Sequence, residues 1–208
     1  MLDLLRCVNA HEDTWLVASL KAISNRFVLD GTLGCPVCHA EYPIKKGIAD
    51  FRIGGEAELT QQPVAGVNRE DLAMRIGAFV NATEPGATVV LGASWAEAAQ
   101  ELSVMTETRV LALNPGKRVE ESESVGLLWV SHEIPLAPAS VLGVALDSSF
   151  PAKIISSALN VVRPGGRIVG PATIDVPTGL AVLARDERYW VGEKPAEMVS
   201  LRRSRISE

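Results

Sequence analysis

Four side chains near the start of the chain have the types and the spacing of a metal site. Cys35 and Cys38 lie in the stretch Cys-Pro-Val-Cys, and Cys7 precedes His11 by four positions. A Cys-x2-Cys turn presents two sulfur atoms on one tight knuckle, and a Cys-x3-His pair adds a sulfur and an imidazole nitrogen. We therefore predict that Cys7, His11, Cys35 and Cys38 bind one structural zinc ion.

Each of these residues also has a simpler interpretation. Cys35 and Cys38 could be buried free thiols, and His11 could be an ordinary surface histidine. His39, directly after Cys38, could compete for the metal. Because so small a block cannot bury enough apolar surface to be stable alone, we expect it to require the metal or contacts with its neighbours.

A second set of candidate residues follows the ends of predicted strands. Gly92 and Ser94 come after the apolar segment 89–91, and Asn114 comes after the segment 109–113. In doubly wound sheets, ligands bind outside the carboxyl ends of the parallel strands. These three residues are therefore candidates for cofactor binding. The simpler interpretation is that a strand-to-helix turn favours glycine and that Asn-Pro-Gly forms a good turn.

The sequence assigns no catalytic residue. Asp147 follows a predicted strand, where α/β sheets place catalytic groups, but Asp-Ser-Ser more simply predicts a helix cap. His132 and Glu133 could form an acid–base pair or could be solvated loop residues. The sequence contains no recognisable Ser/His/Asp triad, phosphate-binding loop with lysine, or cluster of metal-binding carboxylates.

The elements that must position these residues fall into three parts. Residues 1–55 contain short apolar strands around the two metal-binding pairs, with Asp30-Gly31 predicted as a tight turn. Residues 56–85 are predicted to be a polar linker followed by a helix over 71–80, which ends at Glu-Pro-Gly. Residues 86–208 form the largest part.

In this third part, continuous apolar strands alternate with helices, which predicts a mostly parallel sheet covered on both faces. The expected strands are 89–91, 109–113, 125–130, 141–146 and 167–170, and the expected helices are 95–104 and 153–162. Residues 163–166 are expected to turn from helix to strand. Residues 180–205 alternate as antiparallel edge strands do.

Particular stretches resemble two known families. Residues 161–168, Val-Val-Arg-Pro-Gly-Gly-Arg-Ile, resemble the turn before the fifth strand of class I S-adenosylmethionine-dependent methyltransferases. Residues 4–7, 34–38 and 42–44 resemble the small zinc-ribbon family that activates tRNA and protein methyltransferases. Together the resemblances imply an α/β, Rossmann-like methyltransferase fold with a small N-terminal zinc-ribbon domain.

The expected cofactor loop departs from the methyltransferase pattern. That family has several glycines after its first strand and an acidic residue at the end of its second. This chain has one glycine, Gly92, followed by Ala93, Ser94 and Trp95, and it has the neutral Asn114 in place of the acid. Because side chains in the loop would crowd the cofactor, we expect binding of S-adenosylmethionine to be impaired or altered.

Composition limits the setting. The chain of 208 residues is 47% hydrophobic with a net charge of −5, so it can form a core, and no overall charge draws it to nucleic acid or to anionic membranes. No apolar run approaches the ~20 residues of a membrane span, and the first residues lack a signal-peptide pattern. Three cysteines suit a reducing compartment, so we expect a cytoplasmic protein.

Three functions are compatible with these features. The first is a zinc-binding protein whose methyltransferase-like domain has an eroded cofactor loop and serves in binding or regulation. The second is an active S-adenosylmethionine-dependent methyltransferase. The third is a module that activates a separate methyltransferase through its ribbon. The expected partners are accordingly a second copy of the chain or a partner methyltransferase.

Overall fold

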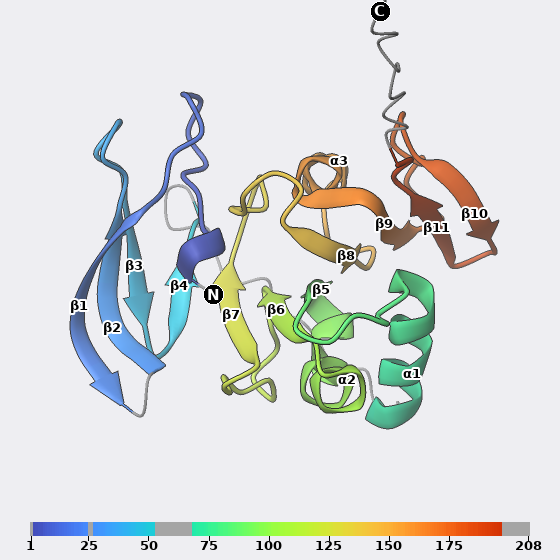
Figure 1. Ribbon diagram of the computed structural model, residues 1–208, viewed down its shortest axis with the longest axis horizontal. Helices are drawn as coiled ribbons and strands as arrows, with labels where there is room; N and C mark the ends of the chain where they lie inside the picture. Colours follow the sequence, from blue (N-terminus) through green and yellow to red (C-terminus); the bar gives the residue numbers. More distant parts are fainter. Residues whose placement is uncertain (1, 25–26, 53–67, 197–208) are drawn as a thin grey trace, which may run out of the picture.

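The computed structural model describes residues 2–24, 27–52 and 68–196, and its strands form one sheet within that part of the chain (Figure 1). The sheet has eleven described strands in the order β1-β2-β3-β4-β7-β6-β5-β8-β9-β11-β10. Most of the predicted linker and the end of the predicted C-terminal edge region, 197–205, lie outside the described residues. Among the described helices, none has the length and the apolar composition needed to cross a membrane.

The centre of the sheet is parallel, as the sequence predicts. Its strands are β5 (Thr88–Gly92), β6 (Arg109–Leu113), β7 (Val125–Trp129), β8 (Val141–Ala145) and β9 (Val162–Pro171). β10 (Ala181–Arg185) and β11 (Tyr189–Glu193) form an antiparallel edge hairpin, in which β11 pairs with β9. Because β5 has β6 on one side and β8 on the other, the strand order reverses direction between β5 and β8.

Helices cover both faces of this parallel region (Figure 1). α1 (Arg69–Val80), the 3₁₀ segment η2 (Ala93–Ala98) and α2 (Ala99–Thr106) pack on one face, and α3 (Ala152–Val161) packs on the other. Val90 of β5 belongs to the core layer with α3, whereas Val89 and Leu91 belong to the layer with α1 and α2. β5 is therefore buried on both sides, which explains its unbroken apolar sequence.

The N-terminal part continues the same sheet. After the 3₁₀ turn η1 (Leu2–Leu4), its strands are β1 (Val17–Ser24), β2 (Phe27–Gly34), β3 (Glu41–Lys45) and β4 (Ile48–Asp50). β4 pairs in parallel with β7. A second tie is made by Leu5 and Arg6, which bridge to Leu136 and donate to the carbonyl oxygen of Pro135, respectively. The division into domains at residue 55 stays a prediction.

One predicted turn is wrong. Asp30 and Gly31 lie inside β2, where they pair with Lys45 and Ile44 of β3. Asp-Gly suits a tight turn, but here the glycine serves a close approach between strands. A Cβ on Gly31 would lie 2.8 Å from the backbone oxygen of Ser19 in β1.

Three helix and turn boundaries also differ from the predictions. α1 ends at Val80, before the Glu-Pro-Gly sequence, because Asn81 adopts the left-handed conformation (φ 53°) and caps the helix. The helix expected over 95–104 begins as 3₁₀ helix and becomes α-helical only at Ala99. The expected turn at 163–166 lies within β9, at a register shift in its pairing with β8.

Candidate metal centre and sheet crevice

The structure brings the four predicted metal ligands together. The ligand atoms of Cys7, His11, Cys35 and Cys38 all lie within 4.8 Å of one another. The Sγ atoms of Cys7 and Cys38 are 3.6 Å apart, and the Sγ of Cys35 lies 3.3 Å from the Nε2 of His11. Ligand atoms at the corners of a tetrahedron around zinc, with Zn–S bonds of about 2.3 Å, are separated by about 3.8 Å. The cluster therefore has the donor set and the size of a Cys3His zinc site.

The Cys-Pro-Val-Cys knuckle closes the hairpin between β2 and β3. The backbone N–H of Cys35 donates to the carbonyl oxygen of Ala40 at 2.9 Å, and the N–H of Cys38 points at the Sγ of Cys35 at 3.5 Å. His39 turns the chain in the left-handed conformation, with φ of 59°. These backbone bonds direct both sulfur atoms to the same side.

The Cys7–His11 pair is positioned by a different part of the molecule. Arg6 is buried, its guanidinium stacks 3.7 Å from the centre of the Trp15 ring, and its Nη1 donates to the carbonyl oxygen of Asp3. The backbone of Arg6 is bonded to Pro135, in the connection between β7 and β8. Half of the cluster is thus anchored to the parallel sheet and half to the β2–β3 hairpin.

Hydrogen bonds and burial affect the protonation of three of the candidate ligands. The backbone N–H of Ala40, with the Asn9 side chain, lowers the pKa of Cys38 to about 6, which favours a thiolate at neutral pH. Burial raises the pKa of Cys7. The Nδ1 of His11 lies 2.6 Å from the carbonyl oxygen of Glu12, to which it can donate. This bond leaves Nε2 available as a ligand atom.

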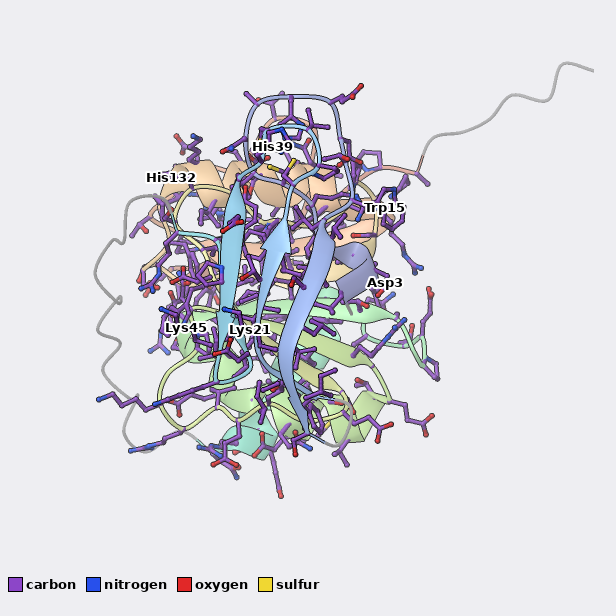
Figure 2. The ribbon with its side chains drawn as sticks, turned by 90° about the vertical axis from the view of Figure 1, so that its left-hand side faces the viewer. Asp3, Trp15, Lys21, His39, Lys45 and His132 are labelled. Carbon is purple, nitrogen blue, oxygen red and sulfur yellow. The ribbon has the colours of Figure 1, made fainter. Side chains whose placement is uncertain are left out.

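His39 does not belong to the cluster. It is exposed, and it lies near the sulfur atoms at the end of the β2–β3 hairpin (Figure 2). Its role in the described structure is to occupy the left-handed position of the knuckle.

The three cofactor candidates lie at the carboxyl ends of β5 and β6, and each of them makes close contacts within the protein. Gly92 ends β5 with a φ of −108°, so it is not a left-handed turn residue. A Cβ at this position would lie 2.5 Å from the Phe150 ring and 2.6 Å from Leu146. Gly92 is therefore needed for close packing against these two buried residues of the segment after β8.

Ser94 is bonded to Asp147. Both its backbone N–H, at 2.9 Å, and its hydroxyl donate to the carboxylate of Asp147. The other carboxylate oxygen of Asp147 accepts from the N–H of Ser149. Asp147 is not the helix cap that the sequence predicts, because α3 begins at Ala152 with Pro151 in the capping position. Its carboxylate instead ties the loop after β5 to the end of β8.

Asn114 joins two strand ends. Its side-chain amide donates to the carbonyl oxygen of Val130 at 3.0 Å and accepts from the N–H of Val130 at 2.8 Å. Asn114 is 1% exposed and has a φ of 48°, in a region that asparagine tolerates better than most residues. Both functional atoms of its side chain are thus bonded to the backbone of Val130, the residue that follows β7.

Of the side chains expected to crowd the loop, Ser94 and Trp95 both line a small cavity of about 190 Å³. The ring of Trp95 packs against Tyr189 and Phe79 in the layer with α1 and α2. The neighbours of Gly92 are Phe150 and Leu146, which no spacing rule connects to it. His132 and Glu133 are both exposed.

No protein-family model matches the chain, and no curated protein sequence matches it. Solved structures resemble it at low identity. The MycE methyltransferase of the mycinamycin biosynthetic pathway is 10% identical over 64% of this chain and 49% of that chain, with a TM-score of 0.48. A Methanococcus maripaludis protein, provisionally assigned as an S-adenosyl-L-methionine-dependent methyltransferase, is 11% identical over 64% of this chain and 87% of that chain, with a TM-score of 0.45.

A third structure is a Galdieria sulphuraria protein provisionally assigned as a sarcosine dimethylglycine methyltransferase. It is 18% identical over 49% of this chain, with a TM-score of 0.41, and the chain spans 45% of its length. These three structures are named as methyltransferases, whereas another of similar score is the [4+2]-cyclase SpnF, so the likeness concerns the fold and not the reaction.

Proposed function

We propose that the protein binds zinc through a structural Cys3His site and serves in binding or regulation rather than in methyl transfer. The observation that carries this proposal is the convergence of the ligand atoms of Cys7, His11, Cys35 and Cys38 to within 4.8 Å. Four protein ligands complete a tetrahedral shell and leave no open position for a substrate, which is typical of structural zinc sites.

Zinc would join two segments that are distant in sequence and that also meet at Tyr42, whose hydroxyl accepts from the N–H of Val8. The segment 7–11 follows residues tied to the connection between β7 and β8, whereas Cys35 and Cys38 lie at the end of the β2–β3 hairpin. All eight residues of β1 are exposed, so β1 contributes little buried surface to this block. A bound ion would supply stabilisation that burial does not.

The packing at the carboxyl ends of the strands supports a role other than methyl transfer. Phe150 and Leu146 occupy the space beside Gly92, the amide of Asn114 is bonded to Val130, and Ser94 is bonded to Asp147. The polar groups of Asn114 and Ser94 are therefore already bonded within the protein, and a methyl donor would have to compete for them. We therefore propose that S-adenosylmethionine is not a cofactor of the protein.

Elemental analysis of the purified protein tests the metal site. We expect close to one zinc ion per chain, and we expect Cys35→Ser to lose both the ion and thermal stability. His11→Ala and His39→Ala form a matched pair, because only His11 contributes an atom to the cluster. His11→Ala should release zinc to a chelator faster, and His39→Ala should not. A Cys35→Ser protein that keeps its zinc and its melting temperature would contradict the assignment.

Calorimetry with S-adenosylmethionine and S-adenosylhomocysteine tests the crevice. We expect both to bind more weakly than about 100 μM, which corresponds to roughly −5.5 kcal/mol. Tighter binding would instead favour an active methyltransferase.

A further inference from the structure

A cavity of about 590 Å³ lies over β6 and β7, on the same face of the sheet as α3. Right-handed crossovers place the connection from β7 to β8 on the same face as α3. This connection, residues 130–140, is fully described and contains no helix. No crossover helix therefore covers this face of β6 and β7, and the cover comes from η1 and β2, which leave a cavity beneath them.

The wall of the cavity is mainly apolar. The residues that form it come from η1, from β2 to β4, and from the face of β6 and β7; the principal ones are Leu5, Phe27, Val28, Ile44, Leu111 and Leu128. Leu5, Ile44, Leu111 and Leu128 are buried and belong to the core layer on this face. A cavity of this volume with apolar walls is in the range that holds a small organic molecule.

The polar groups at the cavity are mostly acidic. Asp3, Glu121 and Glu123 line it together with a single arginine, Arg109. Arg109 donates its Nε and Nη2 to the neutral carbonyl oxygen of Gly86, keeps its positive charge, and attracts the carboxylate of Asp3, so one cation stands against three carboxylates. Asp3 lies on η1, to one side of the N-terminal strands (Figure 2). The cavity therefore carries an excess of negative charge.

Glu121 is the best-placed of these carboxylates. It is half-buried, and burial raises its pKa. Its carboxylate packs directly on the backbone of Gly47, where a Cβ would lie 2.2 Å from Oε2. Burial is the one influence recorded on this pKa, and among the described residues no hydrogen bond or ion pair to the carboxylate is found. A partly desolvated carboxylate at the rim of an apolar cavity is an unmatched acceptor.

We propose that this cavity binds a small molecule with an apolar body and a cationic amine, and that the ammonium group pairs with Glu121. The apolar wall would pack against the body of such a molecule, and the unpaired carboxylate of Glu121 would form an ion pair with its ammonium group. An anionic molecule of the same shape would face Asp3, Glu121 and Glu123 and would be repelled.

Three probes with the same chain and different head groups test the proposal. n-Octylamine, n-octanol and octanoate would each be titrated, below the concentration at which they aggregate, into the purified full-length protein and followed by calorimetry. We expect the amine to bind at least about tenfold more tightly than the alcohol, the lower end of what a hydrogen bond to a charged group contributes. We expect octanoate to bind least.

Matched variants show whether Glu121 is responsible. Glu121→Gln should remove the preference for the amine while n-octanol still binds, and Glu120→Gln, an exposed neighbour that does not line the cavity, should change nothing. Val28→Trp would fill the cavity and should abolish binding of all three probes. Circular dichroism of each variant would establish that it is folded.

Three results would overturn the proposal. The first is that no probe binds to the folded wild-type protein. The second is that octanoate binds as tightly as n-octylamine. The third is that Glu121→Gln and Glu120→Gln keep the same preference for the amine. The assay contains no methyl donor and uses the protein with whatever metal it holds, so its failure can be told apart from failure of the proposed zinc site.

Discussion

Asn114 shows how one residue can have a structural role where a ligand contact was expected. It occupies the strand end at which the methyltransferase family has an acidic residue, and its amide makes two bonds to the backbone of Val130. An amide can donate and accept at once, whereas a carboxylate can only accept. The choice of asparagine is therefore explained by the strand pair.

This difference predicts the effect of placing an acid at this position. Asn114→Asp should lose the bond to the carbonyl oxygen of Val130 and place a buried negative charge against that oxygen, at a cost of about 1–3 kcal/mol in unfolding free energy. Urea denaturation would measure the change. Asn160→Asp, at an exposed position of α3, is the control and should stay within about 0.5 kcal/mol of wild type. Equal stability of the two variants would argue against a stabilising role for the two bonds between Asn114 and Val130.

Glu121 predicts a pH dependence. Burial raises its pKa above the ordinary value of 4.5, so its ionised form is less favourable in the folded protein than in the unfolded chain. The folded state therefore loses stability from this group as the pH rises from 4.5 through the raised pKa.

Glu121→Gln should consequently raise the unfolding free energy near neutral pH and have a smaller effect below pH 4.5. Denaturant unfolding at the two pH values, with Glu120→Gln as the control, would measure this difference. A variant less stable than wild type near neutral pH would mean that the carboxylate has a favourable partner in the folded protein. A residue that serves in ligand binding often lowers the stability of the ligand-free protein, and Glu121 fits this pattern.

At the scale of elements, the end of β5 packs closely on the segment after β8. Gly92→Ala would drive a methyl group into Phe150 and Leu146, and we expect a loss of about 1–3 kcal/mol in unfolding free energy. Gly116→Ala is the control, because its nearest neighbour would be 3.9 Å from the new Cβ. Thermal or urea unfolding would compare the two.

Combining Gly92→Ala with Phe150→Leu tests the mechanism further. The smaller side chain should relieve part of the clash, so the double variant should be more stable than the sum of the single effects predicts. Strict additivity would mean that Gly92 is needed for another reason.

At the scale of the whole molecule, the candidate metal site links the N-terminal strands to the rest of the sheet. Removing the metal should expose the amides of β1, β2 and β3 to fast hydrogen exchange, because β1 is exposed throughout and the knuckle would lose its anchor. β5, β6 and β8, which lie in the centre of the sheet, should keep their protection.

Hydrogen exchange with mass spectrometry, before and after treatment with a chelator, would measure this difference. Adding zinc back should restore protection, which controls for irreversible damage. Unchanged protection of β1 to β3 in the metal-free protein would show that packing alone holds them.

Periodicity and turn chemistry predicted most of the parallel sheet. Local patterns predicted the five apolar segments that form β5 to β9 and the helix expected over 153–162. A buried strand or an amphipathic helix can be recognised from the pattern of apolar residues within a short stretch of sequence. The knuckle is local for the same reason. The turn at Asp30-Gly31 failed because the close approach of β1, a distant segment, decided the role of Gly31.

The sequence by itself determined which residue types could hold a metal, and it determined the alternation of strands and helices. Only the tertiary structure decided that Cys7 and His11 meet Cys35 and Cys38, that Phe150 packs on Gly92, and that β4 pairs with β7. The reason is physical: propensity and spacing act over a few residues, whereas these contacts depend on how distant segments meet across the sheet. The cavity beside Glu121 arises in the same way, from a crossover without a helix and a terminus that folds over it.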